Sequence, residues 1–117
     1  KDVNAQLQWL GNSLGLFSLR DRNSSCFRMF IELLRSSKAG SALSSDELAY
    51  KLDLSRGTVI HHMNRLVEAG IVVSHNNRYM LRVNNLEILV DEIERDLQRA
   101  CEDLKEVAKK IDKELGI

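Results

Sequence analysis

The chain has 117 residues, 44% of them hydrophobic and 29% charged, and its formal net charge at pH 7 is zero. This composition predicts one domain with an appended helix. The sequence has no proline and no low-complexity segment, and we expect neither a signal peptide nor a transmembrane run. Two isolated cysteines suit the reducing cytoplasm, where we expect the protein to reside. Because the chain begins with Lys1 rather than methionine, a larger protein stays open as an alternative.

The N-terminal third predicts two helices joined by an irregular connection. In the first helix, apolar residues recur at heptad-like spacing: Val3, Leu7, Leu10 and Leu14. Gly11 and Gly15 weaken helix propensity, so we interpret them as part of a loop. Cap residues at 21–25 precede the second helix, which we expect to end near Ser37. Residues 41–43 are expected to add a short strand to a later hairpin.

Residues 44–70 carry two short helix patterns joined by a tight polar turn. Ser44 and Glu47 can form a capping box, in which each side chain accepts a hydrogen bond from the backbone of the other. The turn at 53–55 ends in a second N-cap, Ser55. Apolar residues of the second helix recur at helical spacing: Val59, Met63, Leu66 and Val67. Helices this close must cross, as in a helix-turn-helix, whose second helix fits the major groove of DNA.

After Gly70 the periodicity becomes that of strands. Residues 71–75 and 78–83 are rich in β-forming residues, and Asn76 and Asn77 between them tolerate the positive φ angles of a two-residue hairpin turn. In a winged helix-turn-helix, a β-hairpin that follows the second helix is called the wing, and we assign this hairpin to it. The predicted fold class is therefore mainly α with a small β-wing: a winged helix-turn-helix over residues 1–83, with a long C-terminal dimerisation helix over 84–117.

The polar face of the second helix of the pair predicts contacts to double-stranded DNA. Arg65 and Asn64 can make bidentate bonds to guanine and adenine, and His61 can donate to a base or phosphate. A phosphate is also favourable at the helix N-terminus. The expected DNA-binding residues are Ser55, Arg56, Gly57, Thr58, His61, Asn64, Arg65 and, at the tip of the wing, Arg78. A merely solvated face with the same polarity is the alternative.

The segment LSRGTVIHHMNRLVEAGIV at 54–72 resembles the recognition helix of arsenic-repressor-like (ArsR-type) winged-helix regulators. The family pattern is matched by Ser55, Thr58, Val59, His62, Leu66, Ala69, Gly70, Ile71 and Val72, with Met63 where leucine is usual. MarR-type regulators share part of this motif, so it specifies the superfamily better than the family. The resemblance implies a homodimeric transcription regulator.

The metal ligands of metal-sensing ArsR-type regulators are not found at the corresponding positions. Those proteins place Cys-x-Cys on the helix before the recognition helix, or Asp, His and Glu ligands on the last helix. Here Cys26 and Cys101 lie 75 positions apart, and the adjacent His61 and His62 point about 100° apart on one helix. We therefore expect no metal and no other cofactor, and we interpret His62 as a packing residue.

The C-terminal third predicts a helix of about 30 residues with a coiled-coil seam, which would extend about 45 Å. Its a and d positions are Leu86, Val90, Ile93, Leu97, Ala100, Leu104, Val107 and Ile111. A seam of this length needs a partner, and we expect a second copy of the chain. The expected dimerisation residues are Leu7, Leu10, Val90, Ile93, Leu97, Ala100, Leu104, Val107 and Ile111.

Although the net charge is zero, positive and negative charges are distributed unequally along the chain. Residues 1–83 carry 11 Lys+Arg and 7 Asp+Glu, whereas residues 84–117 carry 6 and 10, so the two parts have charges of +4 and −4. A basic domain suits DNA binding. We expect no enzymatic activity, because the sequence holds neither a nucleophile with a base nor a phosphate loop. The alternative function is a winged-helix protein-interaction module in a transcription or chromatin complex.

Overall fold

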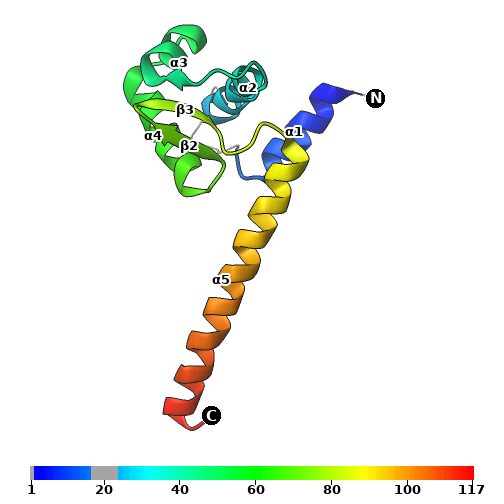
Figure 1. The fold of residues 1–117 in the computed structure, drawn as a ribbon, viewed down its shortest axis with the longest axis vertical. Helices are drawn as coiled ribbons and strands as arrows, with labels where there is room; N and C mark the ends of the chain where they lie inside the picture. Colours follow the sequence, from blue (N-terminus) through cyan, green and yellow to red (C-terminus); the bar gives the residue numbers. More distant parts are fainter. Residues whose placement is uncertain (1, 17–23) are drawn as a thin grey trace. The chain divides into compact units, whose positions relative to one another are not determined.

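A computed structural model of the chain describes residues 2–16 and 24–117. The elements in chain order are α1 (Val3–Ser13), α2 (Ser25–Lys38), β1 (Leu43–Ser44), α3 (Ser45–Leu52), α4 (Arg56–Glu68), β2 (Val72–His75), β3 (Arg78–Leu81) and α5 (Leu86–Leu115) (Figure 1). Contacts divide the chain into two compact units, residues 1–84 and 85–117. The first unit holds α1 to α4 and the sheet, and the second holds α5.

The predicted helix-turn-helix is confirmed as α3 and α4. Ser44 is the N-cap of α3, and both hydrogen bonds of the capping box with Glu47 are formed. Asp53 ends α3 in the left-handed region at φ 54°, which turns the chain sharply, and Ser55 then caps α4. Leu48 of α3 and Val59 of α4 are fully buried, so the crossing helices share the core.

The sheet is antiparallel with strand order β1-β3-β2, so β3 is central. The wing hairpin pairs Val72 with Leu81 and His75 with Arg78, and β1 adds to β3 with Ser44 opposite Arg78. Asn76 and Asn77 have φ angles of 52° and 62°, which confirms the predicted turn.

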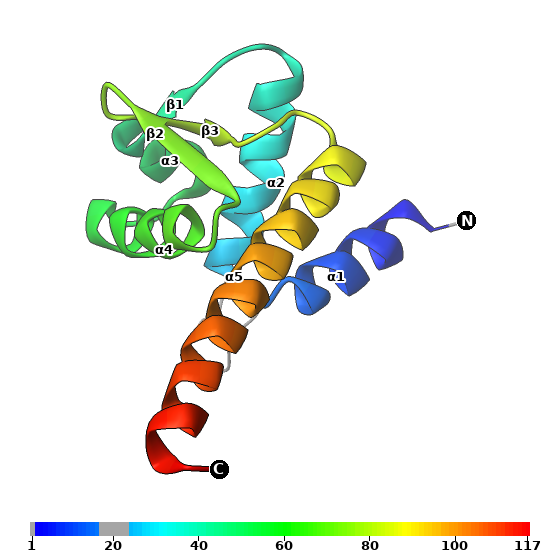
Figure 2. The ribbon, with the colours of Figure 1, turned by 60° about the horizontal axis from the view of Figure 1, so that its bottom comes forward.

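Helix α2 is the centre of the first unit and contacts β3, α3 and α4 (Figure 2). Met29, Phe30 and Leu33 on its inner face are completely buried. Ser37 Oγ accepts a hydrogen bond of 3.1 Å from the backbone N–H of Leu81, which ties the end of α2 to the end of β3. This scaffold fixes the positions of α3, α4 and the wing.

Two local predictions are wrong. Gly11 lies inside α1 and is buried, rather than in a loop, because one glycine costs a helix only about 1 kcal/mol. Val67 is exposed, since the helical spacing of Val59, Met63 and Leu66 already fills the buried face of α4. The N-cap of α2, Ser24, falls within the predicted range 21–25, but its side chain makes no capping bond; residues 21–23 lie outside the described part of the chain.

Helix α5 is a single helix of 30 residues, as its sequence pattern predicts. The Asn85 side chain caps its start by accepting from the backbone N–H of Ile88 at 3.1 Å, and Gly116 ends it at φ 73°. Leu89 is buried, whereas all residues from Leu97 onward are exposed. Among the helices that the structure describes, none combines the length and apolar character needed to cross a membrane.

Candidate nucleic-acid interface

Helix α4 has one buried and one exposed face. Val59, Met63 and Leu66 form most of the buried face. The opposite side, which we call the α4 face, is exposed and consists of Gly57, His61, Asn64, Arg65 and Glu68. Because residues three and four apart share one side of a helix, these side chains form a continuous polar strip along α4.

A serine–threonine pair closes the N-terminus of α4. Ser55 Oγ accepts from the backbone N–H of Thr58 at 3.1 Å, and its hydroxyl donates to Thr58 Oγ1 at 2.8 Å. The pair fixes the direction in which α4 leaves the turn. Ser55 is exposed and Thr58 is half-buried, so the pair reaches the same surface as the α4 face.

Gly57 leaves the backbone of α4 uncovered in the first turn of the helix. A Cβ atom built at this position meets no atom within 4 Å, and the residue lies inside regular helix. Neither packing nor backbone conformation within the described residues therefore requires glycine here. Glycine destabilises a helix by about 0.5–1 kcal/mol relative to alanine, so the residue is unfavourable for the fold itself.

The two adjacent histidines have different environments. His61 is exposed on the α4 face, whereas His62 is buried, as the sequence predicts. Their rings lie 5.3 Å apart at an angle of 59°. His61 is therefore the histidine that can reach a ligand from α4.

Two exposed side chains, one on each helix of the helix-turn-helix, were missed by the sequence interpretation. Ile60 is 36% exposed and lies one turn from both Arg56 and Asn64, and Tyr50 on α3 is 90% exposed. An apolar side chain in this position can contact a thymine methyl group, and a tyrosine hydroxyl can donate to a phosphate. Helical spacing would have revealed Ile60, because it lies well away from the buried face of α4.

Arg56 forms an ion pair that joins the two helices of the motif. Its Nε lies 3.4 Å from Oδ1 of Asp46 in the first turn of α3, and the two side chains are 68% and 74% exposed. The sequence did not predict this partner. The pair lies open to solvent, where an ion pair contributes at most about 1 kcal/mol to folding.

Arg78 forms a second pair with the first turn of α3. Its Nη1 lies 3.0 Å from Glu47 Oε1 and donates to the carbonyl oxygen of Ala42 at 3.1 Å. Hydrogen bonds from Ser44, followed by the charge of Arg78, hold the pKa of the Glu47 carboxyl below its ordinary value. Arg78 follows the turn of the wing, as the sequence predicts, but its side chain reaches toward α3.

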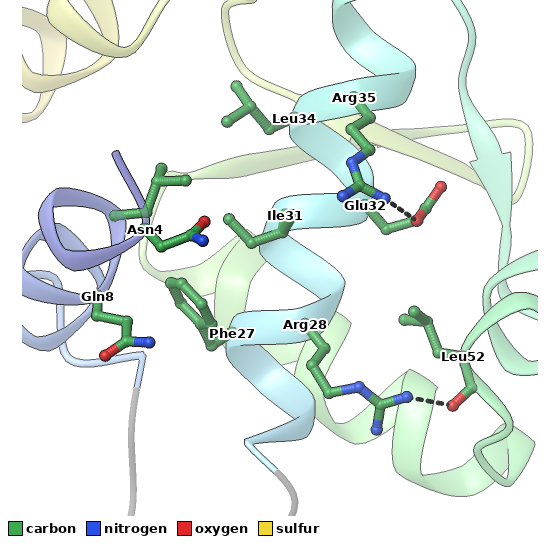
Figure 3. Close-up of a pocket in the computed structure, with 10 residues that line it drawn as sticks. Asn4, Gln8, Phe27, Arg28, Ile31, Glu32, Leu34, Arg35 and Leu52 are labelled. Carbon is green, nitrogen blue, oxygen red and sulfur yellow. Dashed lines mark hydrogen bonds and ion pairs between the residues drawn. The ribbon is translucent and has the colours of Figure 1, made fainter. Parts of the chain in front are cut away.

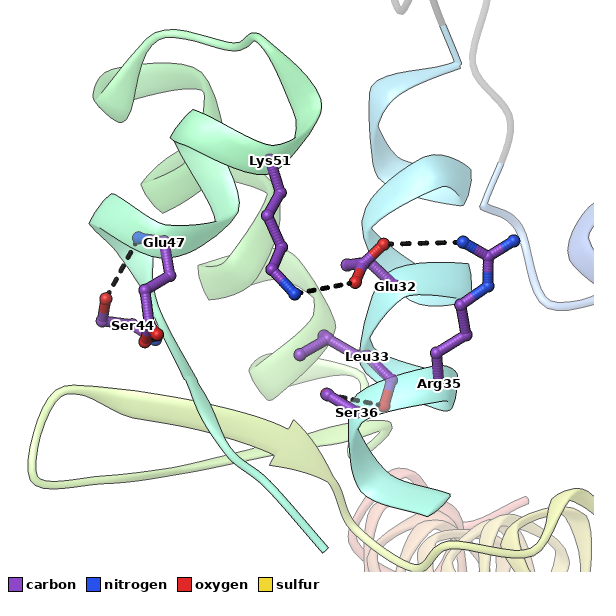
Figure 4. Close-up of polar contacts among 7 residues, drawn as sticks. All are labelled: Glu32, Leu33, Arg35, Ser36, Ser44, Glu47 and Lys51. Atoms are coloured by element: carbon purple, nitrogen blue, oxygen red, sulfur yellow. Dashed lines mark hydrogen bonds and ion pairs between the residues drawn. The ribbon is translucent and has the colours of Figure 1, made fainter. Parts of the chain in front are cut away.

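A third acidic residue links α2 to α3. Glu32 of α2 pairs with Lys51 of α3 at 3.5 Å and with Arg35 at 3.8 Å, as Figure 4 shows beside the Ser44–Glu47 cap. Lys51, Arg56 and Arg78 therefore each have a carboxylate partner. Arg65 on the α4 face has no ion pair within residues 2–16 and 24–117.

Residues 23–75 match the family model of a helix-turn-helix domain, a range that ends within the wing. The chain contains a winged helix-turn-helix domain. No curated protein and no solved structure matches the chain. Domains of this kind place their second helix in the major groove of DNA, and in this chain that helix is α4.

The winged helix-turn-helix domain also has a groove away from the α4 face. It lies between α1 and α2, has a volume of about 510 Å³, and is shown in Figure 3. Apolar side chains of α2 and the amides of Asn4 and Gln8 line it, together with Leu7. Leu7 and Leu10, which the sequence assigns to dimerisation, are half-buried within their own domain. Val3 and Trp9 are the large exposed apolar residues of α1.

More of the large exposed hydrophobic side chains lie on α5 than on any other element that the structure describes. Large exposed hydrophobic side chains along it are Ile88, Val90, Leu97, Leu104, Val107, Ile111 and Leu115. Five of the predicted seam residues are in this set, Ala100 is also exposed, and Ile93 is half-buried. In the described part of the chain, no three His, Cys, Asp or Glu side chains are grouped so that they could hold a metal ion.

Proposed function

We propose that the protein is a sequence-specific regulator of transcription that binds double-stranded DNA as a homodimer, with ArsR-like architecture. The observation that carries this proposal is the exposed polar face of α4, which lies on the major-groove helix of a matched helix-turn-helix domain. The regulator acts by occupying an operator in the cytoplasm and needs neither chemistry nor a cofactor for binding.

Base reading is assigned to the middle of the α4 face. Asn64 and Arg65 are adjacent and exposed, and they offer the bidentate donors and acceptors that distinguish adenine and guanine. Arg65 needs to break no ion pair among the described residues before it bonds to a base. His61 adds a donor one turn earlier. These three residues supply the sequence specificity in our proposal.

Phosphate contacts are assigned to the two ends of the site. Ser55 and Thr58 lie at the N-terminus of α4, where backbone N–H groups and the helix dipole favour an anion. Arg56 at the start of α4 and Arg78 on the wing are exposed and add positive charge, each beside a carboxylate of α3. The +4 charge of residues 1–83 supports the same orientation toward DNA.

Dimerisation is assigned to α5. Its 30 residues correspond to about 45 Å of helix, and the seam includes the exposed residues Leu97 and Leu104. Apolar positions spaced by alternate threes and fours form the buried seam of a coiled coil. A second copy of α5 has the same seam, so two chains can cover one another. A dimer reads two half-sites about one helical turn apart.

The decisive experiment is a fluorescence anisotropy titration of a labelled mixed-sequence duplex, followed by selection from a genomic library. We expect binding that weakens steeply between 50 and 200 mM salt, and an enriched sequence with two-fold symmetry. Library enrichment without symmetry would remove the dimer from the proposal while retaining specific binding. If no duplex binds at low salt, the proposal is wrong.

A second candidate is a protein-interaction winged helix, favoured by the 90% exposure of Tyr50 and by the zero net charge of the chain. A large aromatic side chain in full contact with water is typical of protein interfaces. The duplex titration separates the candidates, because only the first requires DNA binding. Tyr50→Ala then tests what the Tyr50 side chain contacts. If Tyr50 serves a protein partner, the variant retains full affinity for DNA; if it contacts phosphate, affinity falls for every sequence.

A further inference from the structure

The two acidic residues of the first turn of α3 make different contacts. Glu47 has a structural role, since its Oε1 accepts a 2.9 Å hydrogen bond from the backbone of Ser44 and pairs with Arg78. Asp46 takes no part in the capping box, and its carboxylate pairs with Arg56 at the start of α4. The fold therefore depends on Glu47 in a way that it does not depend on Asp46.

Arg56 is placed where a cation would favour DNA binding, yet a carboxylate accompanies it. It occupies the first position of α4, directly after Ser55, and its side chain is 68% exposed. An exposed ion pair of this kind is weak, so a phosphate oxygen can displace Asp46 from Arg56. Once displaced, the Asp46 carboxylate lies next to the phosphate that replaced it and repels that phosphate.

We infer that Asp46 is an intramolecular competitor of DNA phosphate for Arg56 and lowers the affinity of the domain for duplex DNA. This inference rests on the proposed function, because it requires α4 to approach DNA. It assigns Asp46 a role in tuning affinity, separate from base reading by Asn64 and Arg65. Since phosphate contacts do not depend on base sequence, the effect applies to any duplex.

The test compares Asp46→Asn with the wild-type protein on a labelled 30-base-pair duplex of mixed sequence over a salt series. We expect roughly twofold to fivefold tighter binding at low salt, the range that an exposed ion pair corresponds to. The plot of log affinity against log salt should steepen by about one unit, because the Asp46 carboxylate, once phosphate has displaced it, takes up a counterion in the wild type and the amide of the variant does not. Asp112→Asn makes the same charge change on α5 and should leave both quantities unchanged.

A double-mutant cycle tests whether Asp46 affects DNA affinity through Arg56. In an Arg56→Gln background, Asp46→Asn should tighten binding less than it does in the wild-type background, because only the direct repulsion between Asp46 and phosphate remains. If it tightens binding to the same extent in both backgrounds, Asp46 acts by general repulsion and the competition for Arg56 is wrong. Unchanged or weaker binding by Asp46→Asn alone, with normal wild-type binding, also overturns the inference and leaves the proposed function standing. Failure of the wild-type protein to bind any duplex contradicts both.

Discussion

Arg78 and Glu47 tie the wing to the first helix of the helix-turn-helix, with Nη1 and Oε1 3.0 Å apart. The same oxygen accepts the 2.9 Å hydrogen bond from the backbone of Ser44, so one carboxylate serves both the cap of α3 and the first residue of β3. Because Ser44 is also paired with Arg78 in the sheet, strand, cap and ion pair form one joint. Through this joint, the Glu47 carboxylate adds to the β1–β3 pairing in holding the wing against α3.

Glu47→Gln should lower the thermal stability of the domain and make that stability less dependent on pH. The pKa of Glu47 is lowered in the folded protein, first by hydrogen bonds from Ser44 and then by Arg78. A lowered pKa means that the carboxylate stabilises the fold above the unfolded value of about 4.3, and this contribution disappears as the pH falls through the folded pKa.

Thermal unfolding followed by circular dichroism at pH 7 and pH 3 measures this effect. The variant and the wild type should differ at pH 7 and converge at pH 3. Glu106→Gln, an exposed position on α5, removes the same charge and should melt like the wild type at both values. If the variant lost the same thermal stability at both pH values, the loss would have a cause other than the charge of Glu47.

Local signals in the sequence were sufficient to predict the elements of the site. The capping box of Ser44 and Glu47 and the left-handed pair Asn76 and Asn77 each act within four residues, so they are readable without a fold. The pairing of Arg78 with Glu47 spans 31 residues and depends on the docking of β1 against β3, which sequence periodicity does not encode. For the same reason, the Asp46–Arg56 pair could not be predicted from the sequence.

Leu97→Asp should convert a dimer into a monomer. Leu97 is an exposed a position near the middle of the predicted seam, and a carboxylate buried there without a partner costs several kcal/mol. Gln98→Asp, on the neighbouring exposed position, adds the same charge outside the seam and should remain a dimer. Light scattering coupled to size exclusion measures both masses. A wild-type protein that is already monomeric at tens of micromolar contradicts the dimer.

The fluorescence of Trp9 reports whether α1 takes part in the dimer. It is the only tryptophan of the chain and is exposed in the structure of one copy. If a second chain covers it, the emission maximum of the wild type should lie at shorter wavelength than that of the monomeric Leu97→Asp variant, because the indole leaves water. Identical spectra would place the interface on α5 without α1.

Arg65→Ala should reduce both affinity and specificity. Arg65 is exposed on the α4 face, and loss of a bidentate contact to guanine costs about 1–3 kcal/mol and relaxes preference at one base position. Arg78→Ala should instead weaken all sequences alike, with a salt slope smaller by about one unit. Competition between the selected duplex and single-base variants measures both effects. If the two variants bind like the wild type, the protein-interaction candidate is favoured.

Gly57→Ala should stabilise the fold and weaken DNA binding. Alanine is the better helix former by about 0.5–1 kcal/mol, and its Cβ meets no atom within 4 Å in the protein, so the melting temperature should rise. On the α4 face, however, the added Cβ atom prevents a DNA backbone or base edge from closely approaching the backbone of α4. Gly57→Gln, a larger good helix former, should weaken binding further. Opposite changes in stability and affinity separate close approach from misfolding; a variant that melts higher and binds DNA as well as the wild type would show that α4 meets DNA elsewhere.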